Sequence, residues 1–176
     1  MALKPQDIAV ICKLIAQKSS LEWSQNSLAV EMCLSPSQVN SAFKRLVESS
    51  LVTPYRPPNK PRPILQSCKN FFTHGVAYAF PAQQGELVRG MPTSYAAPCL
   101  KQHIAQGDEP IPVWPYAKGK ARGLAIKPLY PALPKALDKF PDQPFYDLLA
   151  LIDAIRTGKA REKNIAIELL SALLSE

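Results

Sequence analysis

The stretch from Gln25 to Val52 reads QNSLAVEMCLSPSQVNSAFKRLVESSLV and predicts two helices that meet at a tight turn. The first helix runs from Gln25 to Met32, and the turn from Cys33 to Ser35. Apolar residues recur three and four positions apart in both helices, which is typical of helices that bury one face. The stretch therefore predicts a helix-turn-helix unit.

The second helix, from Ser35 to Glu48, carries clear signals for its start. Ser35 is the expected N-cap, and Pro36 occupies the first helical position, where its missing N–H costs nothing. Gln38 lies three residues past the cap, so the two form a capping box. The apolar stripe consists of Val39, Ala42, Phe43 and Leu46. These features predict a short, well-defined helix with one buried face.

The opposite face of this helix is polar and basic. The side chains that we predict to reach base edges are Ser37, Gln38, Asn40, Ser41 and Lys44. The side-chain amides of Asn and Gln can donate one hydrogen bond to adenine and accept another from it, and Lys can donate to guanine. A short helix, a fixed turn and a second helix with such a face are the parts that major-groove recognition requires.

A short strand is expected at residues 51–53, followed by the proline-rich segment 54–63. The prolines favour an extended backbone, so this segment would carry its cations on a stiff scaffold. We predict four phosphate contacts, at Arg45, Arg56, Lys60 and Arg62. Either the segment is a wing that grips the DNA backbone, or it is a solvated linker. A wing needs a returning strand, whereas the sequence from Ile64 onward favours a helix.

Residues 3–56 resemble the winged helix-turn-helix domain of bacterial transcriptional regulators, with a layout similar to the MarR-like group. The residues that carry this resemblance are Leu28-Ala29, Leu34-Ser35, Val39, Leu46 and Leu51-Val52. The resemblance covers under a third of the chain. It implies double-stranded DNA binding by a regulator, expected to be a repressor, with residues 37–45 as the reading face. Cys33 stands where such turns often carry glycine.

The chain divides by composition into segments 1–62, 63–143 and 144–176. Sixteen of the 18 prolines lie between Pro54 and Pro144, so the middle segment is expected to be largely irregular. In it we predict a helix over 63–72 and short strands over 76–80, 86–89, 111–114 and 124–127. The predicted fold class is mostly α with a minor β component.

The C-terminal segment predicts a helical hairpin, with helices over 144–157 and 159–174 that meet at Gly158. Its wide apolar band is either a homodimer or partner-docking interface, or it closes over the chain's own core. The basic run Arg156–Lys163 is either a solvated face or a contact for phosphate or an acidic partner. The alternative function is thus a protein-interaction module, such as an antitoxin-like component. Residues 156–163, 74–80 and 89–98 faintly resemble helix-turn-helix proteins that accompany nucleotidyltransferase-type toxins.

Composition and charge set the remaining expectations. The net charge is +7, with eight basic against four acidic residues in 1–65, nine against five in 66–143, and four against five in 144–176. A basic surplus suits a polyanionic partner. No signal peptide or membrane span is evident, so we expect a cytoplasmic protein. The four cysteines lack metal-site spacing, and no catalytic motif is present. We therefore expect free thiols, no cofactor or metal, and no enzymatic activity.

Overall fold

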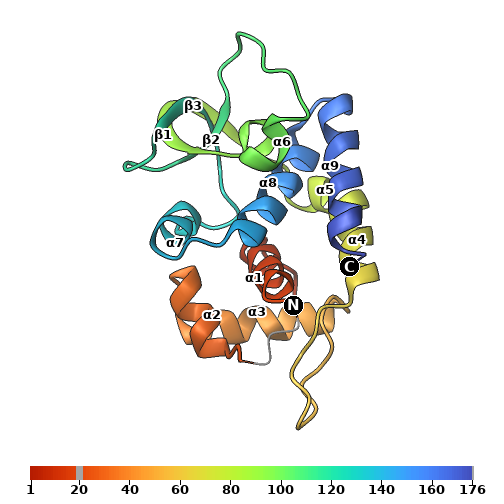
Figure 1. The fold of residues 1–176 in the computed structure, drawn as a ribbon. Helices are drawn as coiled ribbons and strands as arrows, with labels where there is room; N and C mark the ends of the chain where they lie inside the picture. The colour runs from red at the N-terminus through yellow and green to blue at the C-terminus, as the bar shows by residue number, and fades with distance from the viewer. Residues whose placement is uncertain (19–21, 176) are drawn as a thin grey trace.

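The computed structural model describes residues 1–18 and 22–175 and is mostly helical with one small sheet (Figure 1). This agrees with the predicted fold class. The helices are α1 (Pro5–Ala16), α2 (Gln25–Met32), α3 (Pro36–Glu48), α4 (Leu65–His74), α5 (Val76–Ala79), the 3-10 helix η1 (Ser94–Ala96), α6 (Pro98–Lys101), α7 (Leu133–Lys139), α8 (Gln143–Thr157) and α9 (Ala160–Leu173). The strands are β1 (Gln84–Pro92), β2 (Pro112–Pro115) and β3 (Ala121–Ile126).

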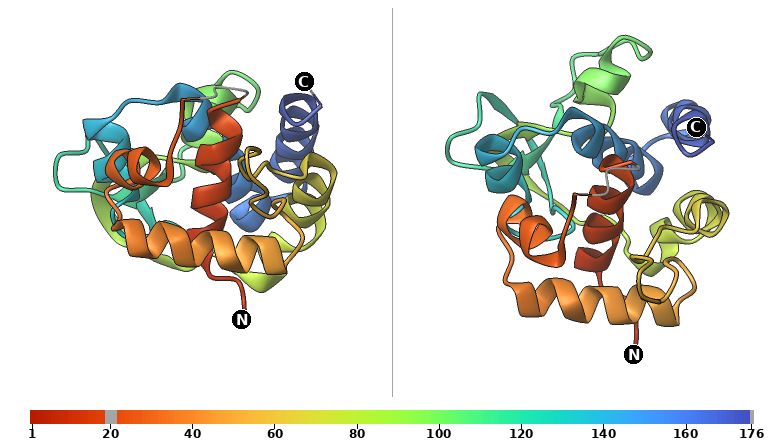
Figure 2. Two further views of the ribbon diagram at one scale, coloured as in Figure 1. Left: turned by 90° about the horizontal axis from the view of Figure 1, so that it is seen from below. Right: turned by 60° about the horizontal axis from the view of Figure 1, so that its bottom comes forward.

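Helix α1 joins the two ends of the fold. It packs on α3 on one side and on α8 on the other (Figures 1 and 2). Its residues from Asp7 to Leu14 are all buried, which includes the apolar Ile8 and Ile11 and also the polar Asp7 and Lys13. Because both faces of α1 are covered, its charged residues need partners inside the protein.

Helix α8 is the centre of the second half of the molecule. Asp142 caps its N-terminus, and the run from Leu148 to Ile155 is buried all round. It packs against α1, α4, α5, α6, α9 and η1. One hydrophobic core contains buried residues from Ile8 near the N-terminus to Leu174 near the C-terminus. All three composition segments therefore contribute to it. For α8, the apolar band thus closes over the chain's own core, whereas α9 buries only Ala166 and Leu170 along its length.

The small sheet has three strands, each paired with the other two. Strand β1 runs antiparallel to both β2 and β3, while β2 and β3 pair in parallel. Close approach of the backbones requires glycine at position 123, because a Cβ there would lie 2.0 Å from the carbonyl oxygen of Ile111. The strands expected over 86–89, 111–114 and 124–127 are confirmed, with bounds that differ by a few residues.

The strand predicted over residues 76–80 is wrong, because the chain continues there as the short helix α5. Val76 is fully buried and Phe80 is partly buried, whereas Tyr78 between them is 81% exposed. Residues four apart share one face of a helix. The alternating pattern that suggested a strand therefore also fits a helix that docks through its two ends.

The proline-rich middle is less irregular than we expected. Pro98 occupies the first turn of α6, and Pro134 occupies the first turn of α7. Proline in a first turn leaves no intrahelical hydrogen bond unmade. High proline content was thus compatible with short helices that the sequence interpretation missed. None of the described helices is both long and apolar enough to cross a bilayer.

Candidate nucleic-acid interface

The turn between α2 and α3 sets the geometry of the candidate reading helix. Cys33 adopts the left-handed conformation (φ 53°, ψ 42°) that glycine favours at helix ends. The N–H of Leu34 then donates to the carbonyl of Ala29 at 2.9 Å. At the start of α3, Ser35 Oγ accepts from the Gln38 N–H at 3.1 Å, and Gln38 Oε1 accepts from the Ser35 N–H at 2.9 Å. The predicted capping box is confirmed.

Four of the five predicted base-reading residues share the outward face of α3. Ser37, Asn40 and Lys44 are exposed, and Ser41 is half-buried. Their spacing of three and four positions keeps them on one side of the helix. Asn40 Nδ2 donates to Gln25 Oε1 of α2 at 3.2 Å, which orients the amide at the surface. This face offers donors and acceptors without large apolar groups.

Gln38 differs from these four. Its side-chain oxygen is the acceptor of the capping box, so the side chain is held at the start of α3. A side chain that satisfies a free N–H of the first turn cannot swing outward without losing that bond. We therefore assign Gln38 to the cap and not to the base-reading face.

The prediction that Arg45 contacts phosphate is wrong. Its guanidinium is 7% exposed and pairs with Asp7 of α1, with Nε–Oδ2 and Nη2–Oδ1 distances of 2.7 Å. The hydrogen bonds to Asp7 raise the pKa of Arg45 further above its already high value, so the group stays charged. Arg45 lies at the edge of the polar face in sequence, but its side chain turns inward because α1 supplies a buried carboxylate. It therefore holds the buried side of α3 against α1.

Residues 51–64 form a narrow hairpin that extends beyond the C-terminal end of α3 (Figure 1). Antiparallel bridges link Val52 to Pro63 and Arg56 to Asn59. A returning arm is thus present, although the sequence suggested none. Each arm is too short and too rich in proline to form a continuous ladder. The expected helix then begins at Leu65, close to the predicted start.

The hairpin brings three of the predicted phosphate contacts together. Arg56, Lys60 and Arg62 line a shallow hollow of about 370 Å³ together with Thr53 and Asn59. Arg56 and Arg62 are exposed. Within residues 1–18 and 22–175, neither guanidinium has an acidic partner. The hollow is therefore a concentration of positive charge with donors at its rim.

Lys60 has a second role that the sequence interpretation missed. Its ammonium donates a hydrogen bond to the carbonyl of Trp23 and lies 5.3 Å from the centre of that indole ring. Trp23 in turn stacks on Phe43 of α3, with ring centroids 5.8 Å apart. This chain of contacts ties the hairpin to the core of the helix-turn-helix. A lysine 37 residues from a tryptophan gives no local signal for such a contact.

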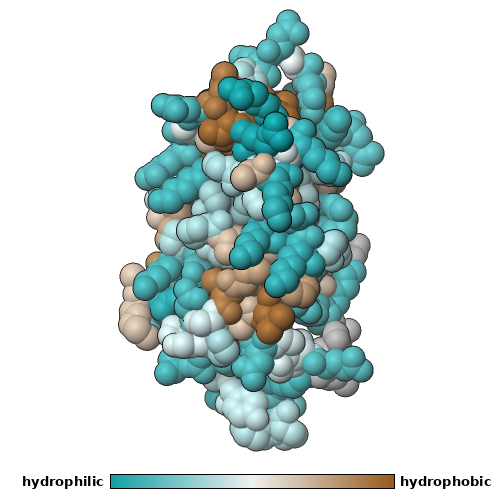
Figure 3. Space-filling model, turned by 90° about the vertical axis from the view of Figure 1, so that its left-hand side faces the viewer, coloured by the Kyte–Doolittle hydropathy of each residue, from teal (hydrophilic) through white to brown (hydrophobic). Residues whose placement is uncertain are grey.

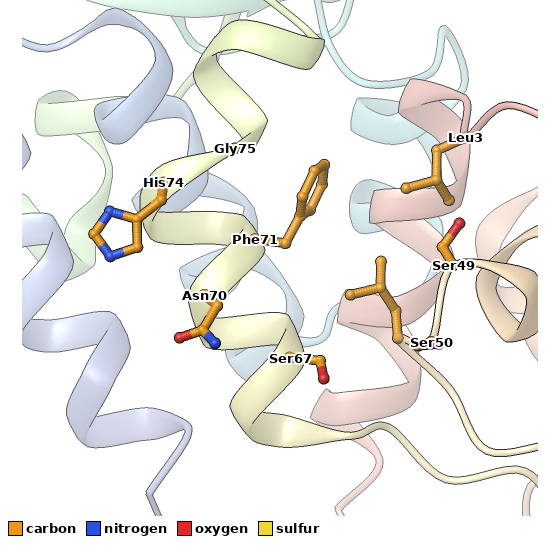
Figure 4. Close-up of a pocket in the computed structure, with 9 residues that line it drawn as sticks. Leu3, Ser49, Ser50, Ser67, Asn70, Phe71, His74 and Gly75 are labelled. Carbon is orange, nitrogen blue, oxygen red and sulfur yellow. The ribbon is translucent and has the colours of Figure 1, made fainter.

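A second hollow, of about 430 Å³, lies between the C-terminal end of α3 and α4 (Figure 4). Phe71 points toward Leu3 and Ser49 across it, and Asn70 and His74 of α4 also contribute to its lining. No lysine or arginine lines this hollow. It offers no positive charge for a phosphate group and is not part of the candidate interface.

The basic run Arg156–Lys163 does not form one surface. Arg156 is held inside, where Nη1 contacts Asp153 Oδ1 at 2.8 Å and Nε donates to the carbonyl of Phe80. Lys159 pairs at the surface with Glu109 at 3.7 Å. Arg156 is therefore structural, and the remaining cations of the run are the part that meets solvent.

Thiol and metal chemistry find little support in the structure. Cys12 and Cys68 are buried, and Cys33 and Cys99 are partly buried, all four as free thiols. Burial raises the pKa of Cys68 and of Cys99 to about 12, so both are protonated and weakly nucleophilic near neutral pH. Across the part of the chain that the structure describes, no three His, Cys, Asp or Glu residues are grouped so that they could hold a metal ion.

Comparisons of this chain with protein-family models, with curated proteins and with solved structures found no match. The geometry of α3 and of the hairpin is therefore the basis for a proposed function.

Proposed function

We propose that this protein binds double-stranded DNA in a sequence-specific manner and acts as a transcriptional regulator of the winged helix-turn-helix class. In this proposal α3 enters the major groove and the hairpin 51–64 is the wing. The observation that carries the proposal is the outward face of Ser37, Asn40, Ser41 and Lys44 beside a hairpin whose arginines have no acidic partner among the described residues. Base edges would be read by this face, and phosphates would be held by the hairpin.

The contacts that hold the buried side of α3 in place favour this proposal. A recognition helix must keep its orientation when it enters a groove, since the register of every base contact depends on it. Here the Asp7–Arg45 ion pair holds the buried side of α3 against α1. The stack of Trp23 on Phe43, together with the contact of Lys60 with Trp23, connects α3 to the hairpin. Homodimerisation remains a prediction. A dimer would place two copies of α3 about one DNA turn apart on a palindromic site.

The proposal is tested by selection of bound duplexes from a random pool, followed by fluorescence anisotropy on the selected duplex and on a scrambled one. A regulator should discriminate by more than about 10³-fold at physiological salt. The logarithm of affinity should fall with the logarithm of salt concentration, with a slope near −0.9 for each phosphate contacted. Equal, weak binding to both duplexes would contradict the proposal.

Lys44→Ala is expected to weaken binding to the selected duplex by roughly ten- to a hundredfold, because a lysine contact to guanine contributes about 1–3 kcal/mol of discrimination. Binding to the scrambled duplex should change little. Lys135→Ala, at an exposed position on α7, is the control and should leave both affinities unchanged. Equal losses on both duplexes for Lys44→Ala would assign this residue to the phosphate backbone instead.

Arg56→Ala and Arg62→Ala should each weaken binding to both duplexes by the same factor. The salt slope should become shallower by about 0.9 for each arginine removed. These two arginines are better probes than Lys60, because Lys60→Ala would also release the hairpin from Trp23. An unchanged salt slope in the Arg56→Ala/Arg62→Ala variant would show that the hairpin is a solvated connection and not a wing.

A further inference from the structure

Two arginines face each other on the outer side of the sheet. Arg89 of β1 lies directly opposite Arg122 of β3 in the antiparallel register, and both are exposed. Residues paired in this way project from the same face, with their Cβ atoms about 4.5–5.5 Å apart. Like charges at that spacing repel and destabilise a sheet. An anion bound between the two guanidinium groups would offset this repulsion.

Nothing in the described chain offsets it. Neither guanidinium has a hydrogen bond or an ion pair within residues 1–18 and 22–175. The loop between β2 and β3 adds Lys118 and Lys120, both exposed, near the same end of the sheet. The local charge is therefore positive and available to an external anion.

An apolar pair lies next to the arginine pair. Two residues along each strand, Leu87 of β1 pairs with Leu124 of β3 on the same face, and Leu87 is 51% exposed. The intervening pair, Val88 with Gly123, points to the other side of the sheet. On this side of the molecule, an apolar patch near the top lies among hydrophilic side chains (Figure 3). The surface thus combines two cations with a leucine pair about 7 Å away along the strands.

This face lies far from the candidate DNA interface. The sheet is at the opposite end of the molecule from α3 and the hairpin, with α7 between the sheet and α2 (Figure 1). DNA held by α3 would leave the outer side of the sheet uncovered. The surface therefore needs a different occupant.

We propose that the outer face of the sheet, formed by Arg89, Arg122, Leu87 and Leu124, binds an extended acidic segment of a partner protein. Carboxylates would form bidentate pairs with the two guanidinium groups. An apolar side chain two residues away in the same extended segment would cover the leucine pair, because strand residues two apart are about 7 Å apart on one side. A nucleic acid backbone would satisfy the arginines but leave the leucines exposed to water. This inference is independent of the DNA-binding proposal.

The test uses the full chain and a fluorescent peptide probe with the sequence Leu-Thr-Glu-Thr-Leu-Thr-Glu, in which leucine and glutamate alternate on one side. Two control peptides replace glutamate by glutamine or leucine by threonine. Anisotropy should show that the probe binds at least about tenfold tighter than either control peptide, because both kinds of contact are used. No difference among the three peptides would overturn the proposal.

Variants then locate the binding site. Arg89→Gln/Arg122→Gln should abolish the preference for the acidic probe, whereas Lys135→Gln/Arg161→Gln, which removes the same charge at exposed positions elsewhere, should retain it. Arg89→Gln alone should raise the melting temperature of the free protein, since it removes the repulsion. A lower melting temperature would show that the pair is structural and would overturn the proposal.

Two further outcomes would also overturn it. If a short DNA duplex displaces the probe, and the Arg89→Gln/Arg122→Gln variant loses that DNA binding, the face is a nucleic-acid surface. If the same variant converts a dimer to a monomer in sedimentation, the occupant is a second copy of this chain.

Discussion

Replacement of Asp7 by alanine is expected to lower the free energy of unfolding by about 3–5 kcal/mol, the usual cost of removing one partner of a buried ion pair. The Asp7 side chain is fully buried and that of Arg45 is 7% exposed, so the variant leaves a guanidinium in the interior without its counter-charge. Asp7 also accepts the Lys4 N–H at 2.8 Å, and this cap of α1 would be lost as well. Urea unfolding followed by circular dichroism measures the change.

A double variant separates the loss of the ion pair from the general effect of mutation. Asp7→Leu/Arg45→Met should be more stable than Asp7→Ala, because replacing both charges by apolar groups leaves nothing unpaired. Glu109→Ala, which removes the exposed partner of Lys159, is the control and should leave the unfolding curve unchanged. If Asp7→Ala also left the curve unchanged, Arg45 would have to reach solvent, which would contradict the buried pair.

Asp153→Ala should have a comparable effect, of about 3–5 kcal/mol, because it leaves several buried groups unpaired at once. Asp153 Oδ2 accepts from Trp114 Nε1 at 2.7 Å and from Thr93 Oγ1 at 2.8 Å, while Oδ1 contacts Arg156. This single carboxylate thus holds α8 to the end of β1 and to β2. Thermal unfolding monitored by tryptophan fluorescence measures the loss, since one of the two tryptophans lies at this site.

Two variants sharpen this prediction. Asp153→Asn keeps an acceptor for Trp114 but removes the charge opposite Arg156, so its loss of stability should be smaller than that of Asp153→Ala. Asp147→Ala removes the same residue type from the same helix, where its carboxylate accepts a hydrogen bond from Gln143 at the surface. It should melt within a few degrees of the parent protein. Equal melting temperatures of the Asp153→Ala and Asp147→Ala variants would contradict the role of Asp153 as the shared partner of several buried groups.

Helices α2 and α3 and the turn between them were predictable because their signals are local. The bounds of α2 and the N-cap of α3 agree with the prediction, since capping residues and apolar spacing act within about one helical turn. Three strands were also located, because short β-prone runs bounded by turn residues indicate strands without knowledge of their partners. Their pairing could not be predicted, so the sequence did not show that Arg89 and Arg122 lie opposite each other.

The candidate site was predictable only in part. A helical projection identifies which residues of α3 point away from its apolar stripe, and four of the five predicted base-reading residues share that face. It does not reveal which polar side chain a neighbouring helix will capture. Arg45 and Lys60 were both assigned to phosphate, but Asp7, 38 residues away, binds Arg45 inside the protein. Trp23, 37 residues away, contacts the exposed Lys60.

The sequence by itself thus determined helices α2 and α3, the mostly helical class and the positions of the three strands, since each depends on interactions between residues near in the chain. The tertiary structure decided which charges are buried, that one core unites the composition segments, and that α5 is a helix. The physical reason is that burial and ion pairing depend on groups brought together from distant positions. Their free energies are set by the surroundings that folding creates and not by the residues alone.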